Sequence, residues 1–82
     1  QWHYGTGKIW GTVEDASNNP LVRRVILYEY HSMLPVKECI SNATTGYYEF
    51  NRLDTTTFFS VIAEDPLDYR YNDIIRSKIR AV

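Results

Sequence analysis

The sequence offers few side chains whose type and spacing would support catalysis. His3 and His31 stand on separate segments, and neither has a cysteine or carboxylate at ligand spacing beside it. Zinc sites usually show close pairs of such ligands, so this arrangement predicts none. Cys39 is the single cysteine, which excludes an internal disulfide, and a nucleophilic thiolate would need an oriented base next to it. We therefore expect no catalytic residue and no metal site, and we expect Cys39 to be a small strand residue.

Acidic side chains gather in the last third of the chain, at Glu64, Asp65, Asp68 and Asp73. Several carboxylate oxygens together can hold a calcium ion. The spacing matches no calcium-binding loop, so solvated loop carboxylates are the favoured interpretation. The sequence also lacks a glycine-rich phosphate loop and a nucleophile-elbow motif. We predict that the chain is not an enzyme and needs no cofactor.

Aromatic residues are the better candidates for binding. Trp10 stands on the polar side of an alternating segment, opposite Ile9 and Val13. Either it covers the edge of the fold or meets the aromatic segment before it, or it is exposed for a partner or a sugar ring. Loop ends of a rigid scaffold are the other usual place for recognition. The candidate binding residues are Trp2, Tyr4, Trp10, Asp68, Tyr69, Tyr71 and Asn72.

Length and charge narrow the classes of function. The 82 residues suffice for one small domain, and a hydrophobic share of 44% is enough for a core. The formal net charge of −1 provides no basic field for nucleic acid. No apolar run reaches the ~20 residues of a membrane span, so we expect no membrane insertion. Because the chain begins with Gln1 and not Met, we expect a processed product or a fragment of a longer protein.

The elements that position these residues are predicted to be strands. Turn-forming residues end at Gly46, and Tyr48 and Phe50 follow on one face of a strand. Further strands are expected over residues 8–14, 21–30, 36–41 and 58–65. The strands over 21–30 and 58–65 carry apolar residues on both faces and should be central. The expected core residues are Ile9, Val13, Val25, Leu27, Tyr48, Phe50, Phe59, Val61 and Ala63.

The secondary structure of the last part of the chain has two interpretations. Ile75 and Ile79 stand at helical spacing, but the same residues could pair as a closing edge strand. We expect a turn followed by a short strand. Even strand spacing with Gly, Pro and Asn between strands predicts an all-β fold, a small antiparallel β-sandwich of about seven strands. Residues 1–7 are expected to be a lead-in segment, and residues 8–82 a single domain.

The order of these motifs resembles a known family. The matching pieces are Gly11-Thr-Val13, Pro20-Leu21, Val25-x-Leu27, Gly46-x-Tyr48-x-Phe50, Leu53 and Phe59-x-Val61-x-Ala63. Together they resemble the carboxypeptidase regulatory-like domains, which are transthyretin-like (prealbumin-like) sandwiches with an Ig-like Greek key. The chain departs from that pattern at Arg23-Arg24, where the family has Gly-Ala, and before Phe58, where it lacks the usual glycine.

A narrower resemblance is to the version of this domain appended to bacteriophage structural proteins. It rests on the segments His3–Gly7, Arg23–Val25 with Leu27-Tyr28, Ala43–Phe50, and Tyr71-Asn72. The resemblance implies a non-catalytic structural or adhesive module of a virion, associated with the tail or fibre and assembled in the host cytoplasm. Its implied partners are other virion proteins, neighbouring domains of a longer chain, or the host cell surface.

Other functions stay open beside this one. The same resemblance fits a capsid decoration module, or an accessory domain of a larger enzyme such as a metallopeptidase. A peptidase domain in the parent sequence would discriminate the last of these. Distant sandwich relatives bind small molecules of the thyroxine or urate type, but the sequence contains no matching set of channel-lining residues.

Overall fold

The computed structural model describes residues 4–15, 17–64 and 72–82. Those residues form strands, turns and loops, and no helix. The strands are β1 (Tyr4–Thr12), β2 (Arg24–Glu29), β3 (Pro35–Ile40), β4 (Tyr47–Leu53), β5 (Phe59–Glu64) and β6 (Asn72–Ile79). The prediction of an all-β fold is therefore confirmed. The described part of the chain contains six strands, where the sequence predicted about seven.

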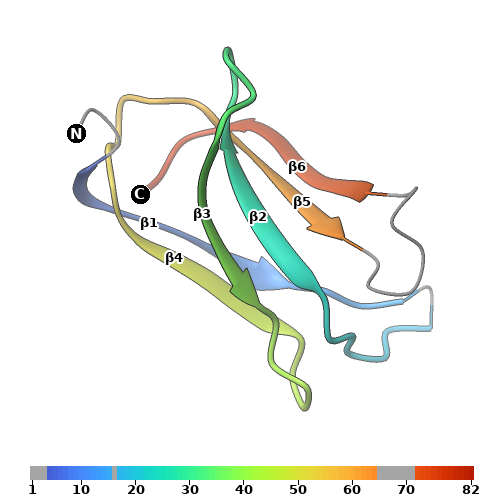
Figure 1. Cartoon of the computed structure of the whole chain (residues 1–82). Coiled ribbons are helices and arrows are strands. Elements are labelled where there is room, and N and C mark those ends of the chain that lie inside the picture. Colours follow the sequence, from blue (N-terminus) through green and yellow to red (C-terminus); the bar gives the residue numbers. More distant parts are fainter. Residues whose placement is uncertain (1–3, 16, 65–71) are drawn as a thin grey trace.

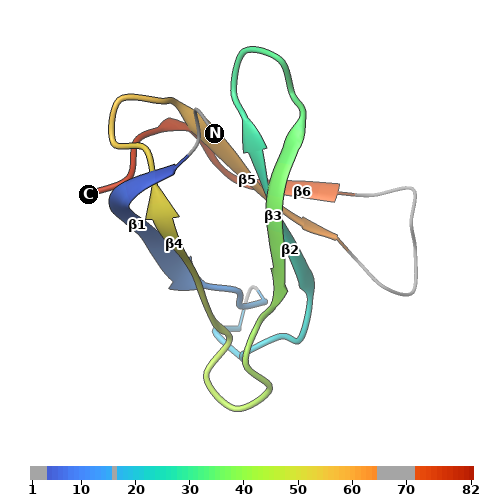
Figure 2. The ribbon, with the colours of Figure 1, turned by 60° about the vertical axis from the view of Figure 1, so that its left-hand side comes forward.

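The strands build two antiparallel sheets. β1 pairs with β4 in a two-stranded sheet, and the other four strands lie in the order β3-β2-β5-β6 (Figure 1). Figure 2 shows the β1–β4 pair to one side of the larger sheet. Two of the pairings join strands that are distant in sequence: β1 pairs with β4, and β2 pairs with β5.

The core lies between the two sheets. Period-two alternation turns one face of each strand inward, and all nine residues expected in the core are buried there. They are Ile9, Val13, Val25, Leu27, Tyr48, Phe50, Phe59, Val61 and Ala63. Leu53 and Ala81 complete the buried cluster.

β2 and β5 are central strands, as their apolar residues on both faces predicted. β2 lies between β3 and β5, and β5 lies between β2 and β6. On the outer face Ile26 pairs with Ile62, and the two side chains are only 5% and 8% exposed. The larger sheet therefore buries apolar residues on both of its sides at this point.

The bounds of β2 differ from the expected strand over residues 21–30. Leu21 donates its N–H to the carbonyl oxygen of Val13 at 2.9 Å, and Arg23 donates its N–H to Ser41 Oγ at 2.8 Å. These hydrogen bonds join residues 21–23 to neighbouring loops, so β2 begins only at Arg24. Tyr30 already belongs to the turn that follows.

β1 begins at Tyr4, inside the segment expected to be a lead-in. Tyr4 and Gly7 both pair with Leu53, with register shifts on either side of Gly7. A Cβ atom on Gly5 would lie 2.5 Å from the carbonyl oxygen of Leu53, so glycine permits this close approach. Residues 4–7 therefore belong to the first strand, and β4 continues to Leu53.

The turn before β4 agrees with the sequence analysis. Asn42 Oδ1 accepts the N–H groups of Thr44 at 2.7 Å and Thr45 at 3.0 Å. Gly46 has a φ of 74°, which glycine adopts without steric cost. The chain thus reverses within a few residues, and β4 starts at Tyr47 with Tyr48 facing the core.

The end of the chain forms a strand and not a helical turn. β6 runs from Asn72 to Ile79 at the edge of the larger sheet and pairs with β5. Beyond it, Val82 and Lys8 exchange two backbone hydrogen bonds, of 2.9 and 3.1 Å. The chain therefore crosses from one sheet to the other after β6, and its last residues lie beside β1 (Figure 1).

Candidate functional site

The outer face of the β1–β4 sheet carries a group of aromatic and polar side chains, which we call the Trp10 face. Its members are Lys8, Trp10, Tyr47, Glu49 and Asn51. Trp10 pairs with Glu49 across the two strands, so alternation brings the other three side chains to the same side. The intervening residues face the core, which leaves these five toward solvent.

Glu49 is the centre of a hydrogen-bond network on this face. Tyr47 donates its hydroxyl to Glu49 Oε1 at 2.8 Å, and Asn51 Nδ2 donates to Glu49 Oε2 at 2.7 Å. Lys8 Nζ lies 3.4 Å from Glu49 Oε1. One carboxylate thus orders an amine, a hydroxyl and an amide around itself.

These contacts shift the titration of the groups that share them. Hydrogen bonds from Asn51 and Tyr47 lower the pKa of Glu49, because they stabilise the ionised carboxylate. The hydrogen bond to Glu49 raises the pKa of Lys8 for the reciprocal reason. The hydrogen bond that Tyr47 donates to Glu49 raises the pKa of the phenol. At neutral pH the face therefore carries one fixed positive and one fixed negative charge, and its phenol keeps its proton.

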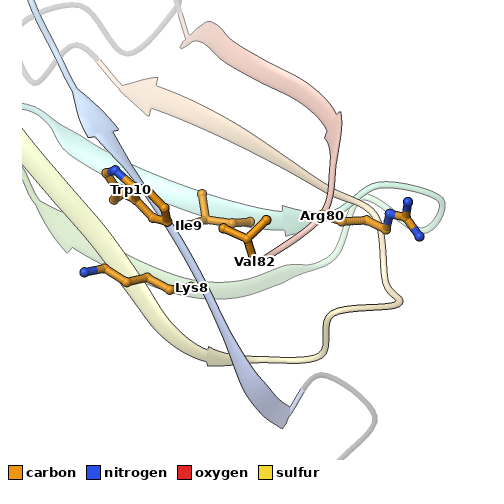
Figure 3. Close-up of a pocket in the computed structure, with 5 residues that line it drawn as sticks. All are labelled: Lys8, Ile9, Trp10, Arg80 and Val82. Carbon is orange, nitrogen blue, oxygen red and sulfur yellow. The ribbon is translucent and has the colours of Figure 1, made fainter.

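Trp10 is the most exposed aromatic residue of this face, with 45% of its surface accessible, and Tyr47 follows with 37%. Lys8 Nζ lies 5.4 Å from the centroid of the Trp10 ring, within cation–π range. Figure 3 shows Lys8 and Trp10 on one side of β1 and Ile9 on the other. An open pocket of about 250 Å³ lies here, lined also by Val82 and Arg80.

This arrangement suits binding better than bond cleavage. Glycoside hydrolysis needs two carboxyl groups across the scissile bond, and the Trp10 face holds one, already engaged by three donors. Within the described residues no group of three or more His, Cys, Asp or Glu side chains is placed to hold a metal ion. An aromatic ring beside ordered donors and acceptors can bind a partner by apolar contact and hydrogen bonds together.

The structure does not gather the binding residues predicted from the sequence into one site. Trp10 is exposed on the β1–β4 sheet. Tyr4 begins β1 and Asn72 begins β6, which lie in different sheets. The other candidates, Trp2, Asp68, Tyr69 and Tyr71, lie outside the described residues. Tyr4 and Trp10 thus share one strand and Asn72 lies in the other sheet, and the binding role of these residues stays a prediction.

Four residues of the Trp10 face were missed by the sequence analysis: Lys8, Tyr47, Glu49 and Asn51. Their alternation was visible, since Lys8 and Trp10 share one face of a strand, as do Tyr47 and Glu49. What the pattern lacks is the pairing of β1 with β4. A register that joins Trp10 to Glu49 would have assembled the whole face.

Comparisons of the chain with known protein families, with curated proteins and with solved structures found no match. In the part of the chain that the structure describes, no helix is long and apolar enough to cross a membrane.

Proposed function

We propose that this chain is a non-catalytic structural or adhesive module of a bacteriophage particle, associated with its tail or fibre. Its task is to hold neighbouring virion proteins or to contact the host cell surface. The observation that carries the proposal is the Trp10 face, an exposed aromatic surface with an ordered polar network on a rigid sheet. Interfaces concentrate their binding energy on such aromatic anchors.

We further propose that the sandwich has the transthyretin-like fold of the carboxypeptidase regulatory-like domains. The motif residues that suggest this family have structural places that support the idea. Tyr48 and Phe50 of the Gly-x-Tyr-x-Phe segment are 2% and 3% exposed, and Gly46 before them has a positive φ. Phe59 and Val61 of the later motif lie in the same buried cluster.

The two-sheet architecture also supports a role in recognition. The core that positions β1 and β4 lies on the inner side, so the outer side chains can change without loss of packing. Lys8 and Glu49 compensate each other's charge, which lets an uncharged partner approach without unpaired buried charge. A partner with apolar and hydrogen-bonding groups, such as a sugar surface or a neighbouring virion protein, matches this chemistry.

The test is binding of the labelled chain to candidate bacterial cells, with Trp10→Ala as the variant. Loss of the aromatic anchor should weaken saturable binding by roughly tenfold or more, since interface aromatics are each worth ~2 kcal/mol or more. Leu34→Ala is the matched control, because Leu34 is a 58% exposed apolar residue in the turn after β2, outside the β1–β4 sheet. The control should bind within about twofold of the parent chain.

The outcomes separate the two forms of the proposal. Binding that weakens only in Trp10→Ala supports host contact and places the site. Binding that is equal in both variants would remove the Trp10 face from the proposal. If no cell surface binds the chain, the adhesive role is rejected, and the partner is to be sought among neighbouring virion proteins by crosslinking from Tyr47.

A further inference from the structure

A second cluster of aromatic residues lies at one end of the larger sheet. Tyr30 and His31 follow β2, and Phe58 directly precedes β5. The rings of Tyr30 and His31 are 5.2 Å apart at an angle of 78°, and those of His31 and Phe58 are 6.4 Å apart at 77°. Tyr30 donates its N–H to the carbonyl oxygen of Phe58 at 2.9 Å. The turn after β2 and the start of β5 are thus held together by edge-to-face rings and a backbone bond.

Two cationic side chains lie against these rings. Lys78 Nζ is 5.5 Å from the centroid of Phe58 and 5.8 Å from that of Tyr30. Arg80 Cζ is 5.4 Å from the same Phe58 ring. We call these five residues the Phe58 cluster. Figure 3 shows the Arg80 side chain pointing away from Lys8 and Trp10. Because Arg80 also lines the pocket beside Trp10, the cluster adjoins the Trp10 face but shares none of its five members.

The backbone of β6 explains how Lys78 reaches this position. Lys78 has a φ of 53°, in the left-handed region that a lysine seldom adopts. The register of β6 against β5 also shifts between the Val61–Arg76 and Phe59–Ile79 pairs. Such irregularities in a strand redirect a side chain. Here the redirected lysine joins Arg80 beside one ring.

Among the residues that the structure describes, no ion pair neutralises the positive charges of this cluster. The ion pairs of the described residues join Lys8 to Glu49 and Arg24 to Glu38 and Glu64, and none includes Lys78 or Arg80. A cation–π contact attracts a cation but leaves its charge in place. Two like charges beside one ring repel each other, and an anion bound to both would relieve that repulsion.

The carboxylates of the adjoining segments are occupied elsewhere. Glu29 accepts the backbone N–H groups of His31 and Ser32, each at 2.8 Å. Asp54 accepts the hydroxyls of Thr56 at 2.9 Å and Thr57 at 2.7 Å. Both carboxylates thus stabilise turns, which leaves the exposed Lys78 and Arg80 available to a bound anion.

We propose that the Phe58 cluster is a binding site for a phosphate group. Arg80 would donate from its planar fork to two phosphate oxygens, and Lys78 would donate as a point charge to a third. Cation–π attraction to Phe58 holds both cations beside one ring. The phosphate can be free, or carried by a sugar or polyol or by a lipid headgroup, and the site recognises the group they share. This inference goes beyond the proposed function: Arg80 lines the pocket beside Trp10, but the Trp10 face takes no part in holding the phosphate.

The experiment is a titration of the whole chain, followed by two-dimensional amide NMR, at low ionic strength so that screening is weak. Inorganic phosphate should shift the signals of residues 30–32, 58 and 78–80 in a saturable way, with acetate at equal ionic strength as the reference anion. Arg80→Gln and Lys78→Gln should each weaken this binding by about fivefold or more. Arg80→Lys keeps the charge but loses the fork, so an intermediate loss is expected.

Arg52→Gln is the matched control. Arg52 is exposed, has a similar left-handed φ of 59°, and lies on β4 in the other sheet. The Arg52→Gln change removes one positive charge, as Arg80→Gln does, but outside the cluster. Its affinity for phosphate should therefore stay within about twofold of that of the parent chain. Equal weakening by Arg52→Gln and Arg80→Gln would attribute the effect to net charge and overturn the proposal. Absence of saturable shifts with phosphate, or equal shifts with acetate, would also overturn it.

Two further arms identify the carrier of the phosphate. Glycerol phosphate that binds at least as tightly as inorganic phosphate, without binding of the chain to phosphatidylglycerol vesicles, indicates a sugar- or polyol-linked phosphate. Binding to phosphatidylglycerol but not to phosphatidylcholine vesicles, lost in Arg80→Gln, indicates a lipid headgroup. Vesicle binding that Arg80→Gln leaves unchanged counts against the site, since it would come from the surface charge as a whole.

Discussion

Glu29 is a buried carboxylate that organises the turn after β2. Only 6% of the residue is exposed, and its two oxygens accept backbone N–H groups from His31 and Ser32. The hydrogen bond from the His31 amide is the largest of the causes that lower the pKa of Glu29 to about 2. The turn that carries His31 in the Phe58 cluster is therefore held by one ionised side chain.

This predicts a stability that falls in acid. Because the folded-state pKa of Glu29, about 2, lies below its ordinary value of 4.5, the folded chain binds fewer protons than the unfolded chain between those values. The contribution is present above the ordinary pKa and is lost as pH falls toward 2. Glu29→Gln should be less stable than the parent chain at about pH 6, and the difference should narrow at about pH 3. Urea unfolding at both pH values measures it.

Glu14→Gln is the control for this prediction, since Glu14 is exposed and lies near the other end of the fold. It should leave the pH dependence of unfolding as it is. A stability difference between Glu29→Gln and the parent chain that stays constant from acid to neutral pH would contradict the role given to the Glu29 carboxylate.

At the scale of elements, the pairing of β1 with β4 depends on one glycine. Gly11 lies opposite Tyr48, and a Cβ atom on Gly11 would come within 2.6 Å of the Tyr48 hydroxyl oxygen and 2.9 Å of the ring. The ring fills the space that a side chain on β1 would occupy. This packing of an aromatic ring over a cross-strand glycine holds the two-stranded sheet against the core.

Gly11→Ala should therefore destabilise the fold by roughly 1–3 kcal/mol, the usual cost of overpacking a filled site. The clash involves the hydroxyl first, so the same change should cost less in a Tyr48→Phe background. Denaturant midpoints of the parent chain, the two single variants and the double variant complete the cycle. Equal costs in both backgrounds would show that Tyr48 does not occupy the space above Gly11.

The same pair of strands marks how far the sequence could be interpreted. Tyr48 and Phe50 were predicted to face the core because a spacing of two encodes a strand face directly. The partner of their strand was not predictable from the sequence. Gly11 pairs with Tyr48 although β2 and β3 lie between them in the chain, and no local pattern indicates that pairing. The Trp10 face and the Phe58 cluster both join residues distant in sequence, so the same limit hid most of their members.

The ends of the strands were mispredicted because the side-chain pattern does not show which groups the backbone binds. Leu21 and Arg23 have the alternation of a strand, but their N–H groups bind Val13 and Ser41 in loops. A period-two pattern reports which way side chains point and does not report what the backbone binds. The helical spacing of Ile75 and Ile79 misleads in a similar way, because β6 is a strand with an irregular register.

At the scale of the whole molecule, stability depends on the core between two small sheets. Tyr48 and Phe50 are 2% and 3% exposed, and their rings contact each other with centroids 6.1 Å apart. Replacing either by alanine should cost roughly 3–5 kcal/mol. Small domains have about 5–15 kcal/mol in total, so either change should remove a large share of the stability and lower the unfolding midpoint markedly.

Thermal unfolding followed by circular dichroism checks this expectation. Leu34→Ala is the control, because Leu34 is an apolar residue that is 58% exposed in the turn after β2, and its midpoint should be nearly unchanged. Losses below ~1 kcal/mol for both aromatic variants would contradict the place of these rings in the core.

The pairing of Lys8 with Val82 has a mechanical consequence. The two residues exchange both of their backbone hydrogen bonds, as an antiparallel pair does, so the chain leaves both partners in the same direction. Tension applied between Tyr4 and Val82 would load those bonds one after another, as in a zipper, and not together in shear. Pulled in this way, the end of the chain would detach from β1 at low force and lengthen before the core between the sheets is loaded.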